Sequence, residues 1–301
     1  MFVLGSKSQI SERKIFSLFS SWIKYTLIIE YLALRNKISR QTLSKRFSVY
    51  LNSPPRVKTY FRKLIKKRIK FSGFLLIDGS WFNRKRCLVV YKDSIGGIVC
   101  WRFSNNEYLS EIKSDLEFLI NNDYPLLGVI SDGKSGIVMA VKSLGIPVQR
   151  CLVHLQMAVQ RSTTQKPKTI AGKDLLLWSQ SLNQITNNYE SKILISWFKR
   201  LHFRHKGFLD EKSYKINPIT GKKHWWYTHK YLRGGYKAVI NALPCMFTYL
   251  KIPNMPKDNN GIEGFFSQLE NKSARHRGFK QDRRENFISW MFWLRKFKQK
   301  P

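Results

Sequence analysis

The sequence predicts an α/β protein in which a mixed five-stranded sheet lies between two helical stretches of chain. Short apolar runs bounded by turn residues alternate with amphipathic helical patterns between residues 72 and 160. Helical patterns without strand signals fill residues 1–71 and most of 161–255. We therefore predict four regions: helical 1–71, the first part of the sheet core 72–160, a mainly α-helical insertion 161–255, and C-terminal helices 256–301.

The composition describes a folded and strongly basic protein. The chain has 301 residues, with 54 Lys and Arg against 19 Asp and Glu, which gives a net charge of +35. Such a charge predicts a polyanionic partner, either nucleic acid or an anionic membrane surface. A hydrophobic content of 43% excludes a disordered basic tail. No apolar run is long enough to span a bilayer, and neither an export signal nor a CxxC pair is present, so we expect a cytoplasmic protein with reduced cysteines.

Three helices are predicted in the first region. Apolar spacing indicates a first helix over Glu12–Arg35. Ser39 is a candidate N-cap for the second helix. Ser53 and Pro54 are the candidate start of the third, because proline suits the first turn of a helix.

The third helix has a basic face. Residues 1–77 hold 17 Lys and Arg but only two acidic residues, whereas a solvated helix normally mixes both signs. We therefore predict a helix-turn-helix-like DNA-binding region; the alternative is a helical bundle with a solvated lysine face. Contacts to phosphate would give affinity without sequence information. The predicted DNA contacts are Arg56, Lys58, Arg62, Lys63, Lys66 and Lys67.

Three strands at the start of the second region predict an antiparallel meander. They cover Phe74–Asp78, Arg86–Asp93 and Ile98–Ser104, and the last two are joined by the turn Ser94–Gly97. The short connections place each strand beside the next.

Two further strands alternate with helices. The predicted order is an amphipathic helix over Asn105–Asp123, a strand over Pro125–Gly133, a helix over Lys134–Gly145, and a strand that starts at Val148 and continues into a helix. Strands joined through helices run parallel, so the whole sheet is predicted to be mixed.

Two aspartates follow apolar strands of this sheet. Asp78 and Asp132 each end a buried run and each precede a glycine. Sites in open sheets lie beyond the carboxyl ends of the strands, so the two carboxylates could lie side by side. Their mutual repulsion is relieved if a divalent cation such as Mg²⁺ binds between them. The alternative for each is an ordinary Asp-Gly turn.

The insertion combines helices with an aromatic and basic run. Helical patterns cover Leu175–Leu182 and Glu190–Phe203, and a Gly/Pro break lies at Asn217–Gly221. The run His224–Tyr236 is predicted to pack in the core of a helical domain; the alternative is stacking on unpaired bases. Beyond it, a helical stripe formed by Ile262, Phe265, Phe266 and Leu269 includes the neighbouring Glu263.

Four motifs in order resemble those of the DDE transposases of bacterial insertion sequences, in the mutator-like group. They are IDGS at Asp78, SDG at Asp132, CLVH ending at His154, and NNGIEGFFSQLENKSARHRG around Glu263. The resemblance covers about residues 71–296. Relatives often carry a cysteine-paired zinc ribbon near the N-terminus, and this sequence has no CxxC pair.

The resemblance implies an RNase H-like core of the retroviral-integrase type, with an all-α insertion. It implies that Asp78, Asp132 and Glu263 are catalytic and bind two Mg²⁺ or Mn²⁺ ions, with Glu270 as a rival to Glu263. The implied reaction is nicking and strand transfer at insertion-sequence ends, since two metals can assist an in-line phosphoryl displacement. The implied partners are terminal-repeat and target DNA in the bacterial nucleoid, with a homo-oligomer on the DNA and no membrane.

Two other groups near these motifs are interpreted as accessory. Cys151 and His154 are expected to support the site rather than to bind zinc, because no second pair is spaced to complete four ligands. The basic group Arg275, His276 and Arg277 is predicted to contact DNA, with a plain surface loop as the alternative. Two rival functions stay open: an RNase H-like structure-selective nuclease, and a decayed transposase that only binds DNA.

Overall fold

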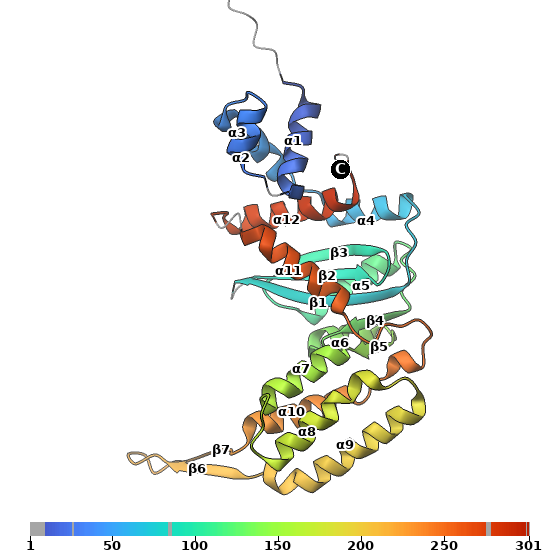
Figure 1. The fold of residues 1–301 in the computed structure, drawn as a ribbon, viewed down its shortest axis with the longest axis vertical. Coiled ribbons are helices and arrows are strands. Elements are labelled where there is room, and N and C mark those ends of the chain that lie inside the picture. The colour runs from blue at the N-terminus through green and yellow to red at the C-terminus, as the bar shows by residue number, and fades with distance from the viewer. Residues whose placement is uncertain (1–9, 26, 84–85, 275–277, 299, 301) are drawn as a thin grey trace, which may run out of the picture. The chain divides into compact units, whose positions relative to one another are not determined.

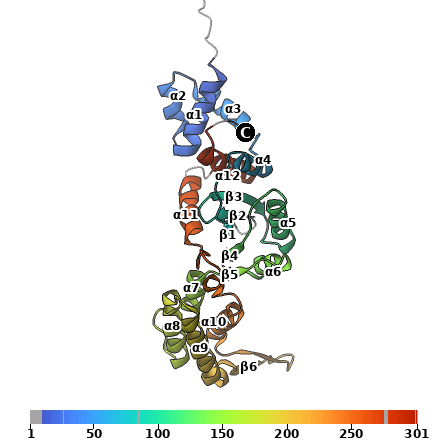
Figure 2. The same cartoon turned by 90° about the vertical axis from the view of Figure 1, so that its right-hand side faces the viewer.

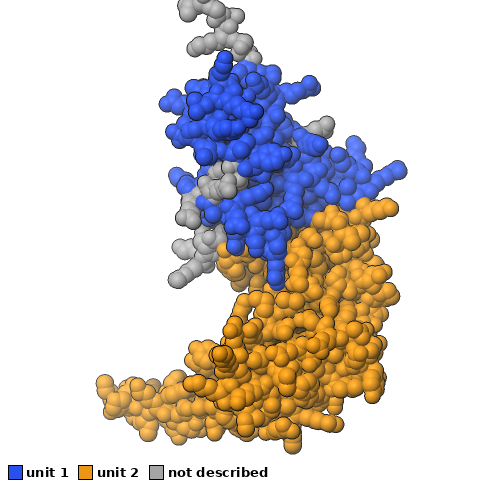
Figure 3. Space-filling view, viewed as in Figure 1, with its two compact units in different colours: residues 1–69, 98–103, 263–301 blue, residues 70–97, 104–262 orange. Residues whose placement is uncertain are grey.

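The computed structural model describes residues 10–25, 27–83, 86–274, 278–298 and 300. The chain forms two compact units, coloured separately in Figure 3. Unit 1 comprises residues 1–69, 98–103 and 263–301, and unit 2 comprises residues 70–97 and 104–262. The four regions predicted from the sequence are consecutive stretches of the chain. Each of the two units instead combines stretches that are far apart in the sequence.

Four helices open the chain: α1 (Glu12–Tyr25), α2 (Ile29–Arg35), α3 (Arg40–Leu51) and α4 (Val57–Lys66). The prediction of one long first helix was wrong, because Ile28 has extended backbone and caps a separate α2. The Ser39 cap is confirmed, since its Oγ accepts a hydrogen bond from the Thr42 N–H at 3.1 Å.

The predicted start of the third helix at Ser53 was also wrong, because α4 begins at Val57. Pro54 and Pro55 follow one another, and a residue that precedes proline is disfavoured in α conformation. Helical geometry therefore becomes available only beyond the second proline.

The core of unit 1 forms around α12 (Gln281–Lys296), which follows α11 (Asn260–Ala274). Eight consecutive residues of α12, 287–294, are buried, so this helix is covered on all sides. Its Trp290 Nε1 donates to the Tyr50 carbonyl of α3 at 2.7 Å. Its Ser289 Oγ accepts from Trp101 Nε1 at 3.3 Å. The N-terminal helices thus share one core with the C-terminal helix.

The central sheet has five strands in the order β3-β2-β1-β4-β5. Their bounds are β1 (Phe74–Asn83), β2 (Arg86–Asp93), β3 (Gly97–Ser104), β4 (Gly128–Ser131) and β5 (Val148–Arg150). β1 pairs antiparallel with β2 and parallel with β4, and β4 pairs parallel with β5. The prediction of a mixed five-stranded sheet is confirmed.

The first strand differs from its prediction in a way that concerns Asp78. β1 continues to Asn83, so Asp78 lies in the middle of the strand and not at its end. The reason is that β1 has two partners of different length. Its parallel pairing with β4 stops at Ile77, whereas its antiparallel pairing with β2 continues through Asp78, which lies opposite Val90.

The helices α5 (Leu109–Ile120) and α6 (Ser135–Ser143) connect the later strands and lie against each other (Figure 2). Tyr91 of β2 donates to the buried Asp115 of α5 at 2.8 Å, which holds α5 to the sheet. The predicted end of α6 at Gly145 is confirmed, since Gly145 has a φ of +70° and its N–H donates to the Lys142 carbonyl.

Four helices form a separate cluster in unit 2: α7 (Leu152–Thr163), α8 (Ile170–Gln180), α9 (Asn188–Leu209) and α10 (Lys230–Ala242) (Figure 1). Trp178, Phe198 and Tyr236 are among the side chains buried between them. Short 3-10 turns at Leu182–Gln184 and Thr248–Leu250 complete this part. No helix among the described residues has both the length and the apolar character to cross a membrane.

A two-stranded hairpin interrupts this cluster and was not predicted. It consists of β6 (Lys212–Ile216) and β7 (Lys223–Tyr227). The expectation that the aromatic run packs in a core is correct for Tyr236, which is 1% exposed, but wrong for Trp225, which is 47% exposed. Eight of the ten residues of β6 and β7 are exposed, so the hairpin has no core of its own.

Candidate acidic site on the central sheet

The register of the sheet brings two of the predicted acids together. Ile77 of β1 is the parallel partner of Ser131 of β4. Asp78 and Asp132 each follow directly, at the point where the parallel pairing ends. Paired residues of neighbouring strands lie about 5 Å apart and face the same side, so the two aspartates start from adjacent positions. This juxtaposition within unit 2 is the basis of the site.

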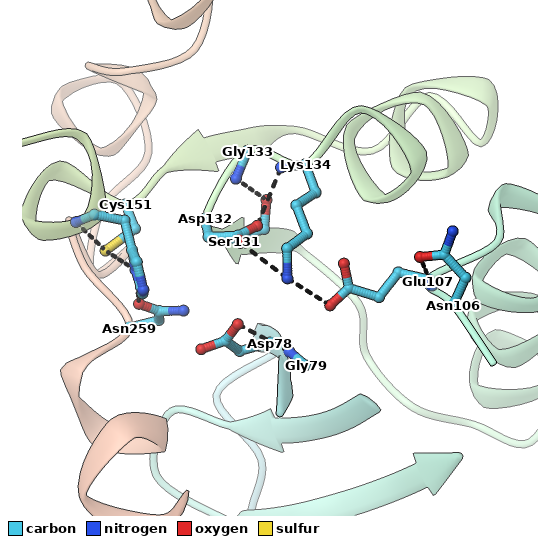
Figure 4. A network of polar contacts seen from close by, with 11 residues as sticks. Asp78, Gly79, Asn106, Glu107, Ser131, Asp132, Gly133, Lys134, Cys151 and Asn259 are labelled. Carbon is cyan, nitrogen blue, oxygen red and sulfur yellow. Dashed lines mark hydrogen bonds and ion pairs between the residues drawn. The ribbon is translucent and has the colours of Figure 1, made fainter. Parts of the chain in front are cut away.

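The Asp78 carboxyl group is buried beside a second aspartate, and both conditions disfavour its ionised form. The residue is 7% exposed, and its Oδ1 accepts one hydrogen bond, from the Gly79 N–H at 2.8 Å. Burial, followed by the negative charge of Asp132, raises the pKa of Asp78 to about 6. Figure 4 shows its carboxylate directed toward the side chain of Asn259.

Lys134 supplies positive charge to the other aspartate. Its Nζ lies 3.3 Å from Asp132 Oδ2 and 2.8 Å from Glu107 Oε1 (Figure 4). Burial by itself would lower the pKa of Lys134, but Asp132 and Glu107 outweigh it and raise that pKa. Burial also raises the pKa of Glu107, against the effect of Lys134. Lys134 therefore stays protonated and links two carboxylates of the site.

The glycine after each aspartate makes room for a charged neighbour. A Cβ on Gly79 would lie 2.0 Å from Glu107 Oε1, and a Cβ on Gly133 would lie 2.0 Å from an Arg150 guanidinium nitrogen. Gly79 lies inside β1, opposite Val89, so the Asp-Gly turn considered for Asp78 is absent. Gly133 has a φ of +81°, which also requires glycine.

A third group completes the site from the start of α7 and the segment before α11. Cys151 caps α7, and its Sγ lies 3.3 Å from His154 Nδ1. The same nitrogen lies 3.1 Å from Asn259 Oδ1, so His154 contacts both Cys151 and Asn259 through Nδ1. Cys151 thus contacts His154, and His154 contacts Asn259, while the supporting role predicted for Cys151 and His154 stays a prediction.

Asn259 carries an unused donor into the site. The residue is fully buried, and its Nδ2 has no hydrogen-bond partner among the described residues. A buried amide N–H without a partner costs about 1–3 kcal/mol, so such a group is usually matched by a ligand or an ordered water. The Asn259 Nδ2 is therefore a buried donor for which the described residues supply no acceptor.

The predicted third carboxylate belongs to the other unit. Glu263 is half-buried in the first turn of α11, and the stripe predicted beside it is confirmed, because Ile262, Phe265 and Leu269 are buried. Its rival Glu270 is exposed on the same helix. Since residues from Glu263 onward are grouped with unit 1, the assembly of Glu263 with the two aspartates stays a prediction.

The residues of the pair fit a divalent cation. The two aspartates at adjacent strand positions carry the oxygen ligands that Mg²⁺ and Mn²⁺ prefer, and the pKa of Asp78 is raised by burial first and by the charge of Asp132 second. No set of three or more His, Cys, Asp or Glu side chains in the described part of the chain is arranged as a metal centre. A cation at the pair would therefore need further ligands and would compete with Lys134 for Asp132.

Three residues of the site were missed by the sequence interpretation: Glu107, Lys134 and Asn259. Asn259 stands at the start of the motif that carries Glu263, so its position could have been noted. Nothing in the sequence around Glu107 indicates that its side chain reaches Gly79, because that contact depends on how α5 and the sheet pack.

The substitution Asp78→Asn is expected to stabilise the metal-free protein at neutral pH. A carboxyl group whose pKa is raised on folding favours the folded state below its ordinary pKa of about 4, and this contribution is lost as the pH rises through about 6. Asp78→Asn should therefore add about 2–3 kcal/mol to the free energy of unfolding above pH 7. Urea unfolding with a chelator present, at several pH values, measures this.

The gain should shrink as the pH falls through about 6 and vanish well below pH 4, where position 78 is neutral in both the folded and the unfolded protein. Asp123→Asn is the matched control, because Asp123 is exposed and has a left-handed backbone (φ 66°) that asparagine tolerates. A stability difference for Asp78→Asn that does not change with pH would contradict the electrostatic account.

The predicted DNA contacts of the N-terminal region lie on α4 and next to it. Lys58, Arg62 and Lys66 are exposed on one face of α4, while Tyr60 and Leu64 are buried on another. Arg56 and Lys67 are also exposed. Lys63 differs, because its Nζ lies 4.5 Å from the ring centroid of Trp293, where it packs against the core. Arg275, His276 and Arg277 lie outside the described residues.

Replacing the exposed basic face of α4 should flatten the salt dependence of DNA binding. Each phosphate contact contributes about 0.9 to the slope of log K against log salt, so Lys58→Ala, Arg62→Ala and Lys66→Ala together should reduce it by about 2.7. Fluorescence anisotropy with labelled duplex DNA across a salt series measures the slope. The full chain is used, because α4 shares its core with α12.

A matched triple variant on α9 removes the same charge elsewhere. Lys192, Lys199 and Lys206 are exposed and seven residues apart. An equal loss of slope in both triple variants would mean that only net charge matters and that α4 is not the contact surface.

The chain was also compared with known proteins. It matches no protein-family model and no curated protein. Among solved structures it is similar to one described as the Drosophila P element transposase strand transfer complex, with 11% sequence identity and a TM-score of 0.46. The match covers 98% of this chain and 94% of that one.

Proposed function

We propose that this protein is a DDE-type DNA transposase that nicks and joins DNA strands at the ends of an insertion sequence. The observation that carries the proposal is the parallel register that puts Asp78 and Asp132 next to each other. These are two of the three acids that the sequence motifs single out. The net charge of +35 supplies the affinity for a polyanionic substrate.

The chemistry assigned to the site follows from its charges. Asp78 and Asp132, joined by Glu263, would hold two Mg²⁺ or Mn²⁺ ions. When bound, two such ions activate the attacking oxygen and stabilise the leaving oxygen of an in-line phosphoryl displacement. The buried carboxylate of Asp78 is ionised above pH 6 and so is ready for a cation at neutral pH.

The remaining residues bind and orient the substrate. Asn259 Nδ2, which has no partner among the described residues, would donate to a non-bridging phosphate oxygen, and the contact of His154 Nδ1 with Asn259 Oδ1 supports this orientation of the amide. Water as the nucleophile gives a nick, and a DNA 3′-hydroxyl gives strand transfer. The same pair would serve a nuclease that does not join strands, so joining has to be measured separately.

One observation favours a second candidate, a decayed transposase that only binds DNA. Lys134 already pairs with Asp132 at 3.3 Å and with Glu107 at 2.8 Å, so the site is partly neutralised without a metal. If the ammonium group outcompetes divalent cations, the protein keeps its DNA affinity and loses the chemistry.

Calorimetric titration with Mn²⁺ and a strand-joining assay separate these candidates. The proposal expects Mn²⁺ to bind, and labelled DNA carrying the inverted repeats that flank the gene to be nicked and joined. Nicking without joining would indicate a nuclease. Absence of both Mn²⁺ binding and nicking, with DNA binding intact, would overturn the proposal in favour of the DNA-binding candidate.

A further inference from the structure

The hairpin formed by β6 and β7 has an unusual composition for an exposed element. Residues 212–227 contain four lysines and four aromatic residues but no aspartate or glutamate. Tyr214 is 53% exposed and Trp225 is 47% exposed. Figure 1 shows the hairpin extending beyond the helices of its unit. A two-stranded hairpin is marginally stable, and exposed rings add no core to it, so packing does not explain these side chains.

The strand register places most of the rings on one face. Tyr214 pairs with Trp225, and Lys212 pairs with Tyr227, so these four side chains point to the same side. Ile216 and Lys223 continue that face toward the turn. We call it the aromatic face. The opposite face carries Ser213, Lys215, His224 and Trp226.

Every aromatic ring of the aromatic face has a cation over it. Lys212 Nζ lies 4.4 Å from the centroid of the Trp225 ring, and Lys223 Nζ lies 4.0 Å from that of Tyr214. The Arg233 guanidinium of α10 lies 3.8 Å from the Tyr227 ring, and Trp225 and Tyr227 meet edge to face at 5.4 Å. The result is a row of alternating rings and positive charges along one side of the hairpin.

We propose that the aromatic face binds single-stranded nucleic acid. A nucleotide offers a flat base to each ring and a phosphate to each ammonium group. Exchanging the cation–π contact for a base stack therefore leaves the lysine paired with phosphate rather than without a partner. Bases in a duplex are stacked on each other and cannot lie on the rings, so unpaired strands are the better ligand.

An anionic membrane surface is the competing partner for such a hairpin. The lysines of the aromatic face lie over the rings, so inserting the rings into an apolar layer would carry the ammonium groups with them at a cost. The spacing of charge and ring therefore favours nucleic acid. The inference goes beyond the proposed function, because binding here requires no chemistry at Asp78 or Asp132.

Two tryptophans on opposite faces provide a matched test. Trp225 and Trp226 are adjacent, both exposed, and on different sides of the hairpin. In the full chain, Trp225→Ala should weaken binding of a labelled oligothymidylate by about tenfold, the size of one lost base stack, and Trp226→Ala by less than about twofold. Trp225→Phe keeps an aromatic ring and should retain most of the affinity. Fluorescence anisotropy measures all three.

The same variants give the outcomes that overturn the proposal. Equal affinities for Trp225→Ala and Trp226→Ala would show that the aromatic face has no special role. A tenfold loss for Trp225→Ala in binding to anionic phosphatidylserine vesicles, with oligothymidylate affinity unchanged, would assign the face to a membrane. Circular dichroism and thermal unfolding of each variant show whether the fold is intact, and Trp225→Phe separates loss of the ring from loss of structure.

Discussion

Asp78→Asn and Asp132→Asn are each expected to reduce Mg²⁺-dependent nicking by about a thousandfold or more while DNA affinity stays unchanged. Metal ions contribute several kcal/mol of transition-state stabilisation, and each 1.4 kcal/mol is about a factor of ten in rate. Neither substitution changes the size of the side chain, and both aspartates lie at adjacent register positions, so both should show the same loss. Nicking of labelled end DNA, measured against Mg²⁺ concentration, provides the test.

The third acid is tested in the same assay. Glu263→Gln should match the aspartate variants, and Glu270→Gln should stay close to the wild-type rate. Asp123→Asn serves as the surface control, because Asp123 is exposed. If Asp78→Asn, Asp132→Asn or Glu263→Gln nicks DNA at the wild-type rate, that residue does not belong to the proposed triad. Full activity of both aspartate variants would refute the proposed site as a whole.

Asp93→Ala is expected to destabilise the fold by about 4 kcal/mol, which is the usual cost of removing one partner of a buried charged network. Asp93 is completely buried at the end of β2. Its two oxygens accept hydrogen bonds from six donors: the Ser72, Gly73, Ile95 and Gly96 N–H groups and the Ser72 and Tyr124 hydroxyls. Without Asp93 these donors lose their acceptor, and those of Gly73, Gly96 and Tyr124 are buried.

The loss of stability caused by Asp93→Ala should depend on pH. Burial by itself would raise the pKa of Asp93, but the hydrogen bonds from Tyr124, Gly96, Ser72 and Ile95 outweigh it and lower that pKa. A lowered pKa stabilises the fold above the ordinary value of about 4, and this contribution is lost as the pH falls through the pKa of the folded state. The difference between wild type and Asp93→Ala should therefore shrink below about pH 4.

Urea unfolding of a graded series checks the assignment. Tyr124→Phe removes a single donor and should cost about 1 kcal/mol, which is less than Asp93→Ala. A cost for Asp93→Ala no larger than that of Tyr124→Phe would contradict the role of Asp93 as the anchor between β1 and β2.

Local chemistry explains which parts of this protein could be predicted. A short apolar run followed by turn residues defined β2 at Arg86–Asp93 without error, because an unbroken apolar run and a tight turn are properties of neighbouring residues. The Ser39 cap and the Gly145 helix end were equally local. The hairpin at Lys212–Tyr227 was missed because its strands bury no face, and so show no apolar alternation.

The roles of the charged residues depended on contacts between distant segments. Lys134 would count as a surface lysine on sequence alone, but packing of α6 against α5 brings it to Glu107. Gly79 looked like part of a turn, and only the place of the Glu107 carboxylate shows why no side chain fits there. Trp225 and Tyr236 belong to one aromatic run, yet one is exposed and the other buried.

By itself the sequence determined the strongly basic character of this protein, the order of its central strands and helices, and the two aspartates that follow the apolar runs of β1 and β4. Those features are set by residue type and by spacing between near neighbours. Tertiary structure alone decided that Asp78 lies within a longer strand, that Lys134 and Asn259 line the acidic site, and that the hairpin aromatics face outward. The physical reason is that burial, charge pairing and strand register depend on segments brought together by packing, which spacing along the chain does not encode.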